Sequence, residues 1–474
     1  MTSPVAAEHI GEEPDDEEPA LREQLTERED KIYVENPHRI DLFGKPLSLI
    51  IQSEMSLEVL SHAELGDPSL DYGRLLSTGE IEFEGFYAAT PSISVFAQLN
   101  LIDERDLDSS NPDGESGFFL ERGEMWLHYH EISGGPFSIE LGRLDFEDDR
   151  LWWWDAELDA VRLTWEQDDF EATVALAHEC FPSRSDEGFI DPEHEDVTRI
   201  LVENSWDWHE DHSVQMFFLH SRDRSGGGNV GDILRETRED EFDGDLAWAG
   251  VRFAGAIEAP RRALVGYWLD AGYVRGRETI RESDDFAPGL VEIEDIRTVD
   301  VEGWGFDAGT TILFPHPWEP RLTLGWAMGS GDSDPDDGLD RGYRQTSIQG
   351  NEPGFGGAER FNAYGVLLEP ELSNLSVFSL GLGCTLLESS SLDLVYHNYR
   401  LAHAADELRD SRIDTDLTGG GRDVGHGLDL ILALEEWESV QFELSASTFR
   451  AGRAFGRDEG TWAFGATAAL RFAF

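Results

Sequence analysis

Hydrophobic and polar residues alternate along most of the chain, and the longest unbroken alternation stands at its end. From Thr461 to Phe474 one face reads Trp462, Phe464, Ala466, Ala468, Leu470, Phe472 and Phe474, and the other Ala463, Gly465, Thr467, Ala469, Arg471 and Ala473. A period of two predicts a β-strand with one apolar face. Aromatic residues at both ends of that face are typical of a strand that crosses an outer membrane with its apolar side on lipid.

Comparable segments recur from about residue 47 onward. Among them are 92–102, 137–142, 161–166, 304–314, 322–328, 378–386, 428–434 and 440–448. Eighteen or nineteen such segments can be drawn, of which 359–368 is the weakest because it runs into Pro370. A closed antiparallel barrel with both termini on one side needs an even number, so we predict about 18 strands.

The connections between these segments alternate in length. Tight links lie near 134–135, 168–169, 207–212 and 387–391, and longer ones over 103–116, 182–195, 224–243, 276–300, 330–358 and 403–423. We therefore predict an all-β fold: one antiparallel transmembrane β-barrel over 36–474, with short periplasmic turns and long extracellular loops. Residues 1–35 are acidic and poor in large apolar side chains, which predicts a flexible segment. A large soluble, secreted β-protein is the alternative.

Charge and hydropathy argue against several classes of protein. The formal net charge is −62, from 98 acidic and 36 basic residues, which makes nucleic acid an improbable partner. Salt near 1 M shortens the screening length to about 3 Å, so we interpret the acid excess as adaptation to a saline habitat. No run approaches the ~18 apolar residues of a transmembrane helix. Met1 is followed by no apolar core of a signal peptide, so we expect a misplaced start or a removed leader.

Motifs for catalysis or cofactors are weak. Gly226, Gly228 and Gly231 satisfy G-x-G-x-x-G but lie in a polar loop rather than between a strand and a helix. The segment 332–343 begins with calcium-loop spacing and then departs from it at the glycine and at the final glutamate. The 14 histidines show no metal spacing, and the two cysteines predict neither a metal site nor a disulfide. We expect no enzyme activity, no cofactor and no metal.

Charged residues recur within the predicted strands, among them Arg162 and Arg400. A lipid-facing arginine costs about 2–4 kcal/mol at the middle of the membrane, so these side chains are expected to point into the lumen. Opposed basic and acidic side chains would line a hydrated pore and set its selectivity. Salt bridges that merely fill the lumen are the equally weighted alternative.

Two stretches resemble the alginate-export family of outer-membrane porins. The first runs from Leu141-Gly142-Arg143 through Asp148-Asp149-Arg150 and Trp154-Asp155 to Glu157-Leu158-Asp159-Ala160. The second includes Tyr343-Arg344-Gln345-Thr346, Phe355-Gly356-Gly357, Arg360-Phe361, Glu369-Pro370-Glu371-Leu372-Ser373-Asn374-Leu375, Tyr396-His397-Asn398-Tyr399-Arg400 and Asp423-Val424-Gly425-His426. Asp145, Glu147, Gly123 and Met328 depart from the family pattern at positions where arginine is expected.

The resemblance implies a monomeric outer-membrane channel that passes an anionic, alginate-like uronate polysaccharide, or a related hydrophilic saccharide, by passive diffusion. The residues expected to line its pore or bind substrate are Arg143, Arg150, Asp155, Arg162, Arg344, Arg360, His397 and Arg400. Expected partners are outer-membrane lipid, the barrel-assembly machinery through Phe474, and export components of the periplasm. The alternatives are a general or cation-preferring porin for small solutes, and a barrel enzyme.

Overall fold

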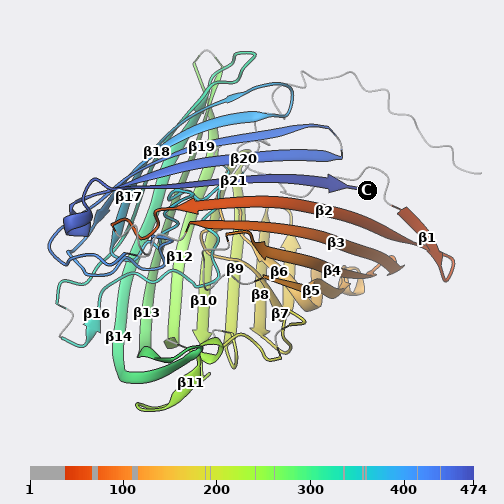
Figure 1. Cartoon of the computed structure of the whole chain (residues 1–474). Helices are drawn as coiled ribbons and strands as arrows, with labels where there is room; N and C mark the ends of the chain where they lie inside the picture. Colours follow the sequence, from red (N-terminus) through yellow and green to blue (C-terminus); the bar gives the residue numbers. More distant parts are fainter. Residues whose placement is uncertain are drawn as a thin grey trace, which may run out of the picture.

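The computed structural model describes residues 38–66, 73–108, 116–186, 188–192, 194–240, 242–260, 262–334, 337–354, 357, 360–413, 415–437 and 439–474. These residues form one antiparallel β-barrel with almost no helix (Figure 1). The expected flexible segment 1–35 lies outside the described residues. Among those described, no helix has the length and apolar character needed to cross a membrane.

Eighteen strands build the barrel wall. They are β2 (Lys45–Ser61), β3 (Arg74–Thr90), β4 (Ile93–Asp106), β5 (Ser116–Tyr129), β6 (Phe137–Glu147), β7 (Asp155–Gln167), β8 (Phe170–His178), β9 (Thr198–His209), β10 (His212–Arg222), β12 (Phe242–Ala259), β13 (Ala263–Ala287), β14 (Leu290–Leu313), β15 (Arg321–Gly329), β17 (Leu375–Thr385), β18 (Ser391–Leu401), β19 (Asp423–Trp437), β20 (Val440–Ala451) and β21 (Trp462–Ala473). Three short strands, β1 (His38–Leu42), β11 (Ile233–Arg235) and β16 (Leu339–Asp340), stand outside this ring. The predicted strand number is confirmed.

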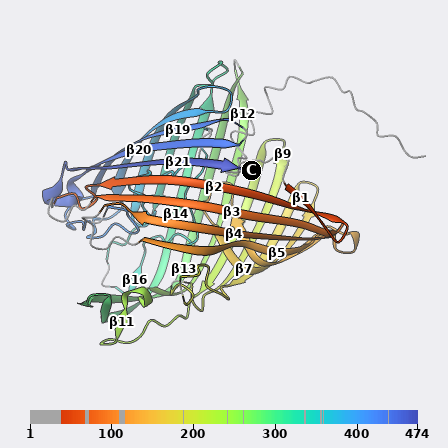
Figure 2. The ribbon, with the colours of Figure 1, turned by 45° about the vertical axis from the view of Figure 1, so that its right-hand side comes forward.

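Each wall strand pairs antiparallel with its neighbours, and β2 pairs with β21 to close the ring, as both ribbon views show (Figures 1 and 2). Met55 lies opposite Leu470 across this closing seam. The backbone N–H of Phe474 donates to the carbonyl oxygen of Ile51 at 2.8 Å. Closure leaves no unpaired edge between the first and last wall strands.

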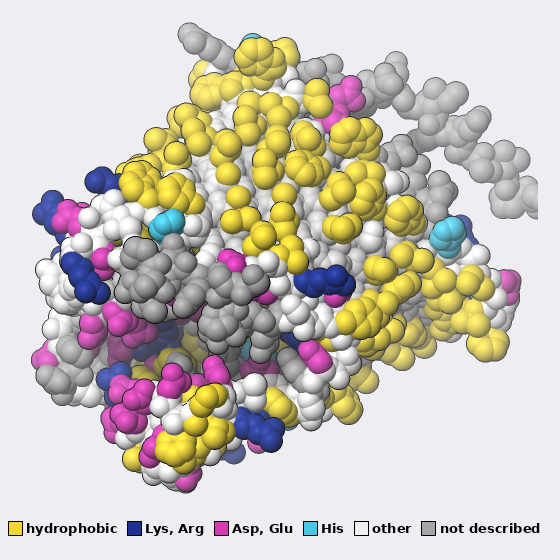
Figure 3. Space-filling model, viewed as in Figure 1, with side chains coloured by type: hydrophobic (Ala, Val, Ile, Leu, Met, Phe, Trp, Pro, Cys, Tyr) yellow, Lys and Arg dark blue, Asp and Glu magenta, His cyan; other side chains and the backbone are white. Residues whose placement is uncertain are grey.

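Alternation within the strands separates an outer from an inner face. On β12, Ala249, Phe253 and Ile257 are exposed, whereas Trp248 and Arg252 on the other face are buried. Figure 3 shows hydrophobic side chains covering the outer surface over the strands, while charged side chains gather at the lower left, by the long connections. This arrangement places apolar residues on lipid, as the sequence pattern predicted.

Connections at one end of the barrel are short, such as 91–92 between β3 and β4, and those at the other end are longer, such as 179–197 between β8 and β9. One expected long loop, 276–300, is instead a hairpin, because β13 and β14 continue to Ala287 and Leu290 and turn at Gly289. The weak candidate 359–368 is not a wall strand. It belongs to a long connection, 330–374, that folds into the barrel.

The extracellular half of the interior is not an open tube. Segment 148–154, between β6 and β7, and segment 330–374, between β15 and β17, enter the barrel and bury large side chains there. We call these side chains, together with the wall residues packed on them, the inner cluster: Trp152, Trp153, Trp154, Tyr343, Tyr364, Leu367, Leu368, Leu372, Tyr399 and Phe449. Of the two alternatives, a hydrated pore and a filled lumen, this half of the barrel is closer to the second, although apolar side chains fill it together with the salt bridges.

Candidate pore and vestibule

Segment 148–154 is held by a carboxylate at its start. The two oxygens of Asp148 accept hydrogen bonds from the backbone N–H groups of Arg150, at 3.1 Å, and of Trp153 and Trp154, at 2.7 and 3.0 Å. The fully buried Arg252 of β12 contacts the same carboxylate at 2.5 Å. Charge-assisted bonds of this kind are stronger than neutral ones, so they fix the segment against the wall.

Arg150 attaches the same segment to two further wall strands. Its guanidinium contacts Asp270 on β13 at 3.2 Å and Asp307 on β14 at 3.0 Å, and lies 4.3 Å from the ring centroid of Trp268. Asp307 also accepts from the indole N–H of Trp268 at 2.9 Å and from the hydroxyl of Tyr364 at 3.2 Å. Segments 148–154 and 330–374 are thereby joined to the same wall carboxylate.

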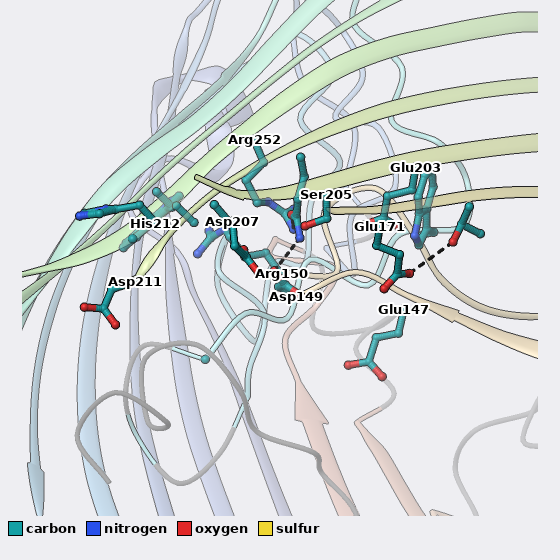
Figure 4. Close-up of a pocket in the computed structure, with 18 of the residues that line it drawn as sticks. Glu147, Asp149, Arg150, Glu171, Glu203, Ser205, Asp207, Asp211, His212 and Arg252 are labelled. Carbon is teal, nitrogen blue, oxygen red and sulfur yellow. Dashed lines mark hydrogen bonds between the residues drawn. The ribbon is translucent and has the colours of Figure 1, made fainter. Parts of the chain in front are cut away.

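Below this network, toward the short turns, lies a cavity of about 870 Å³ that we call the vestibule (Figure 4). Wall strands β6 to β10 and β12 to β14 supply most of its lining, and Arg150 and Trp154 form part of its roof. Its eight carboxylates are Glu140, Glu147, Asp149, Glu171, Glu203, Asp207, Glu210 and Asp211, and its four arginines are Arg150, Arg162, Arg252 and Arg360.

Every vestibule arginine is bound to a carboxylate. Arg162 contacts Glu140 at 2.6 Å, and Arg360 contacts Glu147. Arg150 and Arg252 are bound to the buried carboxylates described above. Eight carboxylates against four arginines leave the lining with a formal charge of −4. Such a lining attracts cations, because negative charges on a wall of low dielectric constant raise the local concentration of counter-ions.

A second cavity, of about 440 Å³, opens among the long connections and is lined by Glu369 and by residues of segment 407–416. Burial, with the carboxylates of Glu352 and Asp410 nearby, raises the pKa of Glu369 to about 7. Arg412 reaches from this cavity to Glu58 on β2 and lies 3.4 Å from Glu369. The two cavities share no lining residue, and the inner cluster extends from Trp154 in the vestibule roof to Leu368, beside Glu369.

The predicted site residues fall into three groups. Arg150, Arg162 and Arg360 line the vestibule, and their role as pore residues stays a prediction. Arg143 and Asp155 line a smaller cavity of about 290 Å³ under segment 179–194, where Arg143 contacts Glu157 at 3.0 Å. A role of these two residues in the pore stays a prediction.

The remaining candidates lie apart from the vestibule. Arg344 is buried near the long connections, where it binds Glu278 at 3.0 Å and Asp340 at 2.6 Å. His397 is fully buried in the interior, 3.1 Å from Asp429. Arg400 requires a correction: it is exposed on the outer face of β18, which Leu394 shares, so it does not line the lumen. One residue past a register shift at Tyr399, it stands at the end of the strand, where polar side chains meet headgroups rather than hydrocarbon.

Sequence reasoning did not select the residues that anchor segment 148–154. Asp148, Asp270 and Trp268 lack a distinguishing motif, and only their contacts with Arg150 and Arg252 in the structure show that they act together. The available signal was the Asp148-Asp149-Arg150 run, since adjacent opposite charges in a connection otherwise rich in tryptophan suggest a structured segment.

Comparisons with known proteins identify the family. The family model described as "Alginate export" matches residues 82–466. The chain belongs to the alginate export family. Among curated relatives, the "Alginate production protein AlgE" of Pseudomonas aeruginosa is 25% identical over 339 residues, covering 70% of this chain and 67% of the relative. The protein of that name from Pseudomonas syringae pv. tomato is 22% identical over 378 residues, covering 71% and 72%.

Solved structures share the barrel of this alginate-export protein. Pseudomonas aeruginosa OpdK with vanillate matches with a TM-score of 0.55 at 9% identity, over 90% of this chain and 98% of that one. Pseudomonas aeruginosa OccK2 (OpdF) in complex with glucuronate matches with a TM-score of 0.53 at 9% identity, with the same coverage. At such identities the likeness shows the fold alone. Family and fold together make the chain an outer-membrane transport channel for polysaccharide rather than an enzyme.

Proposed function

We propose that this channel passes a hydrophilic uronate polysaccharide by passive diffusion through the vestibule. The names of the curated relatives connect them with alginate production, and the vestibule supplies paired carboxylates and guanidinium groups at which hydroxyl and carboxylate groups of a sugar chain exchange hydrogen bonds. Several weak sites along a wall favour throughput over a single tight one.

The charge of the vestibule determines how a polyanion can enter it. A lining with four more carboxylates than arginines repels an uncompensated polyanion. The uronate chain therefore enters together with its counter-cations, and its entry improves as salt screens the lining. At about 1 M salt the screening length falls to roughly 3 Å, which weakens the repulsion between the lining and the chain. A saline habitat, which the composition also favours, is part of this proposal.

Planar-bilayer recording tests the proposal. Purified protein is expected to give discrete conductance steps, and a hexameric oligomannuronate is expected to block them for longer in 1 M than in 0.1 M KCl. The absence of conductance from a correctly folded barrel contradicts the channel function. Conductance with uronate block that weakens as salt rises contradicts the counter-cation route.

A cation-preferring porin for small solutes is the second candidate, favoured by the same excess of carboxylates. Reversal potential in a KCl gradient measures cation preference, which both candidates expect. Oligouronate block separates them, because a channel that serves only small solutes shows no specific block by a hexamer.

We further propose three kinds of contact. The outer face binds outer-membrane lipid, and the barrel acts as a monomer because its own β2 and β21 close the wall. The barrel-assembly machinery recognises Phe474 as the terminal aromatic residue. Export components of the periplasm bind the end of the barrel with the short turns.

A further inference from the structure

A row of aromatic side chains crosses the inner face of β3, β4 and β5 near the end with short turns. Phe86 is the register partner of Phe96, and Phe96 is the register partner of Trp126. They share the inner face with the buried Ser94 and Gln98, as alternation along β4 requires. We call Phe86, Phe96 and Trp126 the aromatic row.

The aromatic row is ordered and partly exposed on the inner face of the wall. The rings of Phe96 and Trp126 are stacked with centroids 5.4 Å apart and planes inclined by 23°. The indole N–H of Trp126 donates to Glu124 at 3.0 Å, which fixes the ring orientation. Phe86 is 41% exposed and Phe96 is half-buried, whereas Trp126 is half-buried because part of its ring packs against the hydrophobic cluster of the interior.

The strand beside Trp126 has a glycine next to the indole ring. Its register partner on β6 is Gly142, whose φ of +140° and close approach to the backbone of Met125 exclude a side chain. No side chain of the partner position therefore covers that side of the indole ring. One row nearer the turns, Glu140 is paired in register with both His128 and Arg162, and Glu140 and Arg162 line the vestibule.

We propose that the aromatic row is a saccharide subsite on which pyranose rings stack as the chain passes along the inner face of the wall beside the vestibule. The C–H face of a pyranose is apolar and weakly positive, and it complements the negative face of an aromatic ring. Its equatorial hydroxyl groups lie at the ring edge, where Glu124 on one side and Glu140 with Arg162 on the other provide hydrogen-bonding groups. The subsite rests on the proposed function and adds recognition of the sugar ring itself, independent of its charge.

The test compares Trp126→Leu with the wild type in planar bilayers. Leucine keeps an apolar side chain in the strand but removes the flat ring, so the residence time of a blocking hexamer is expected to fall roughly two- to tenfold, mostly through faster dissociation. Both maltohexaose, which is neutral, and hexameric oligomannuronate are used, because stacking does not require charge. Trp126→Phe is expected to restore most of the residence time.

Trp304→Leu is the matched control, since Trp304 is an exposed indole on the outer face of β14. Heat-modifiable migration establishes that each variant is folded. Shortened residence of either hexamer in Trp126→Leu but not in Trp304→Leu supports the subsite. Unchanged residence of both hexamers overturns it while leaving the channel function intact, whereas absence of conductance in the wild type contradicts the proposed function itself.

Discussion

Replacing Arg150 by glutamine is expected to release segment 148–154 from the barrel wall and to open the channel. Arg150 is buried and bridges Asp270 and Asp307, at 3.2 and 3.0 Å. Glutamine preserves much of the length but removes the charge, which leaves carboxylates buried with less compensation. Breaking a buried ion pair in this way typically costs about 3–5 kcal/mol. Because Asp270 keeps Arg252 and Asp307 keeps two neutral donors, we expect a value near the lower limit, about 3 kcal/mol.

If the bridge exists only in the closed arrangement, about 3 kcal/mol changes the ratio of closed to open channels by roughly a hundredfold. Planar-bilayer recording of Arg150→Gln should show a correspondingly larger open fraction. Arg277→Gln is the matched control, because Arg277 forms an ion pair whose partners are 68% and 60% exposed and which contributes little. In the double variant Arg150→Gln with Asp307→Asn, the effect should be smaller than the sum of the single effects, since both charges of one pair are absent. An Arg150→Gln channel with wild-type open fraction and thermal stability would refute the anchoring role.

Three further predictions concern charge, topology and assembly. The pKa of Glu369 is raised to about 7, so the folded state binds this proton more tightly than the unfolded state. The stability that this group contributes is therefore present at low pH and is lost as pH rises toward 7. Cation preference in reversal-potential measurements should fall as pH is lowered from 8 to 6, except in Glu369→Gln. Cys180 is exposed in a long connection, whereas Cys384 lies near a short turn, so a membrane-impermeant maleimide should label only Cys180 in intact cells. Phe474→Ala should lower the heat-modifiable fraction in outer membranes by several-fold if the terminal aromatic directs assembly, and an unchanged fraction would argue against that role.

The architecture could be predicted because the geometry of a membrane barrel requires apolar and polar residues to alternate along each strand. Each wall strand must present apolar residues to lipid at every second position, and the strand from Trp462 to Ala473 does so without interruption. Strand number and closure followed from counting such segments. The same rule misplaced the hairpin of β13 and β14, because beyond the membrane both faces of a strand meet water and alternation no longer distinguishes strand from loop.

The vestibule was predictable only in part. Arg162 could be selected as a strand charge that must avoid lipid, and Arg150 and Arg360 by the family resemblance. The argument from lipid misassigned Arg400, since a position at the end of a strand has no need to point inward. Pairing between distant strands also has no local signature. Nothing in the sequence around Asp270 shows that its carboxylate contacts an arginine 120 positions earlier.

The inner cluster could not be predicted from hydropathy, because its side chains belong to connections that fold into the barrel. Trp152, Trp153 and Trp154 are consecutive, so they read as a turn with apolar character rather than as a strand, and their burial depends on the wall that surrounds them. Burying them offsets the cost of ordering a segment inside the barrel, because each indole removes a large apolar surface from water. The buried charges then determine where the segment sits.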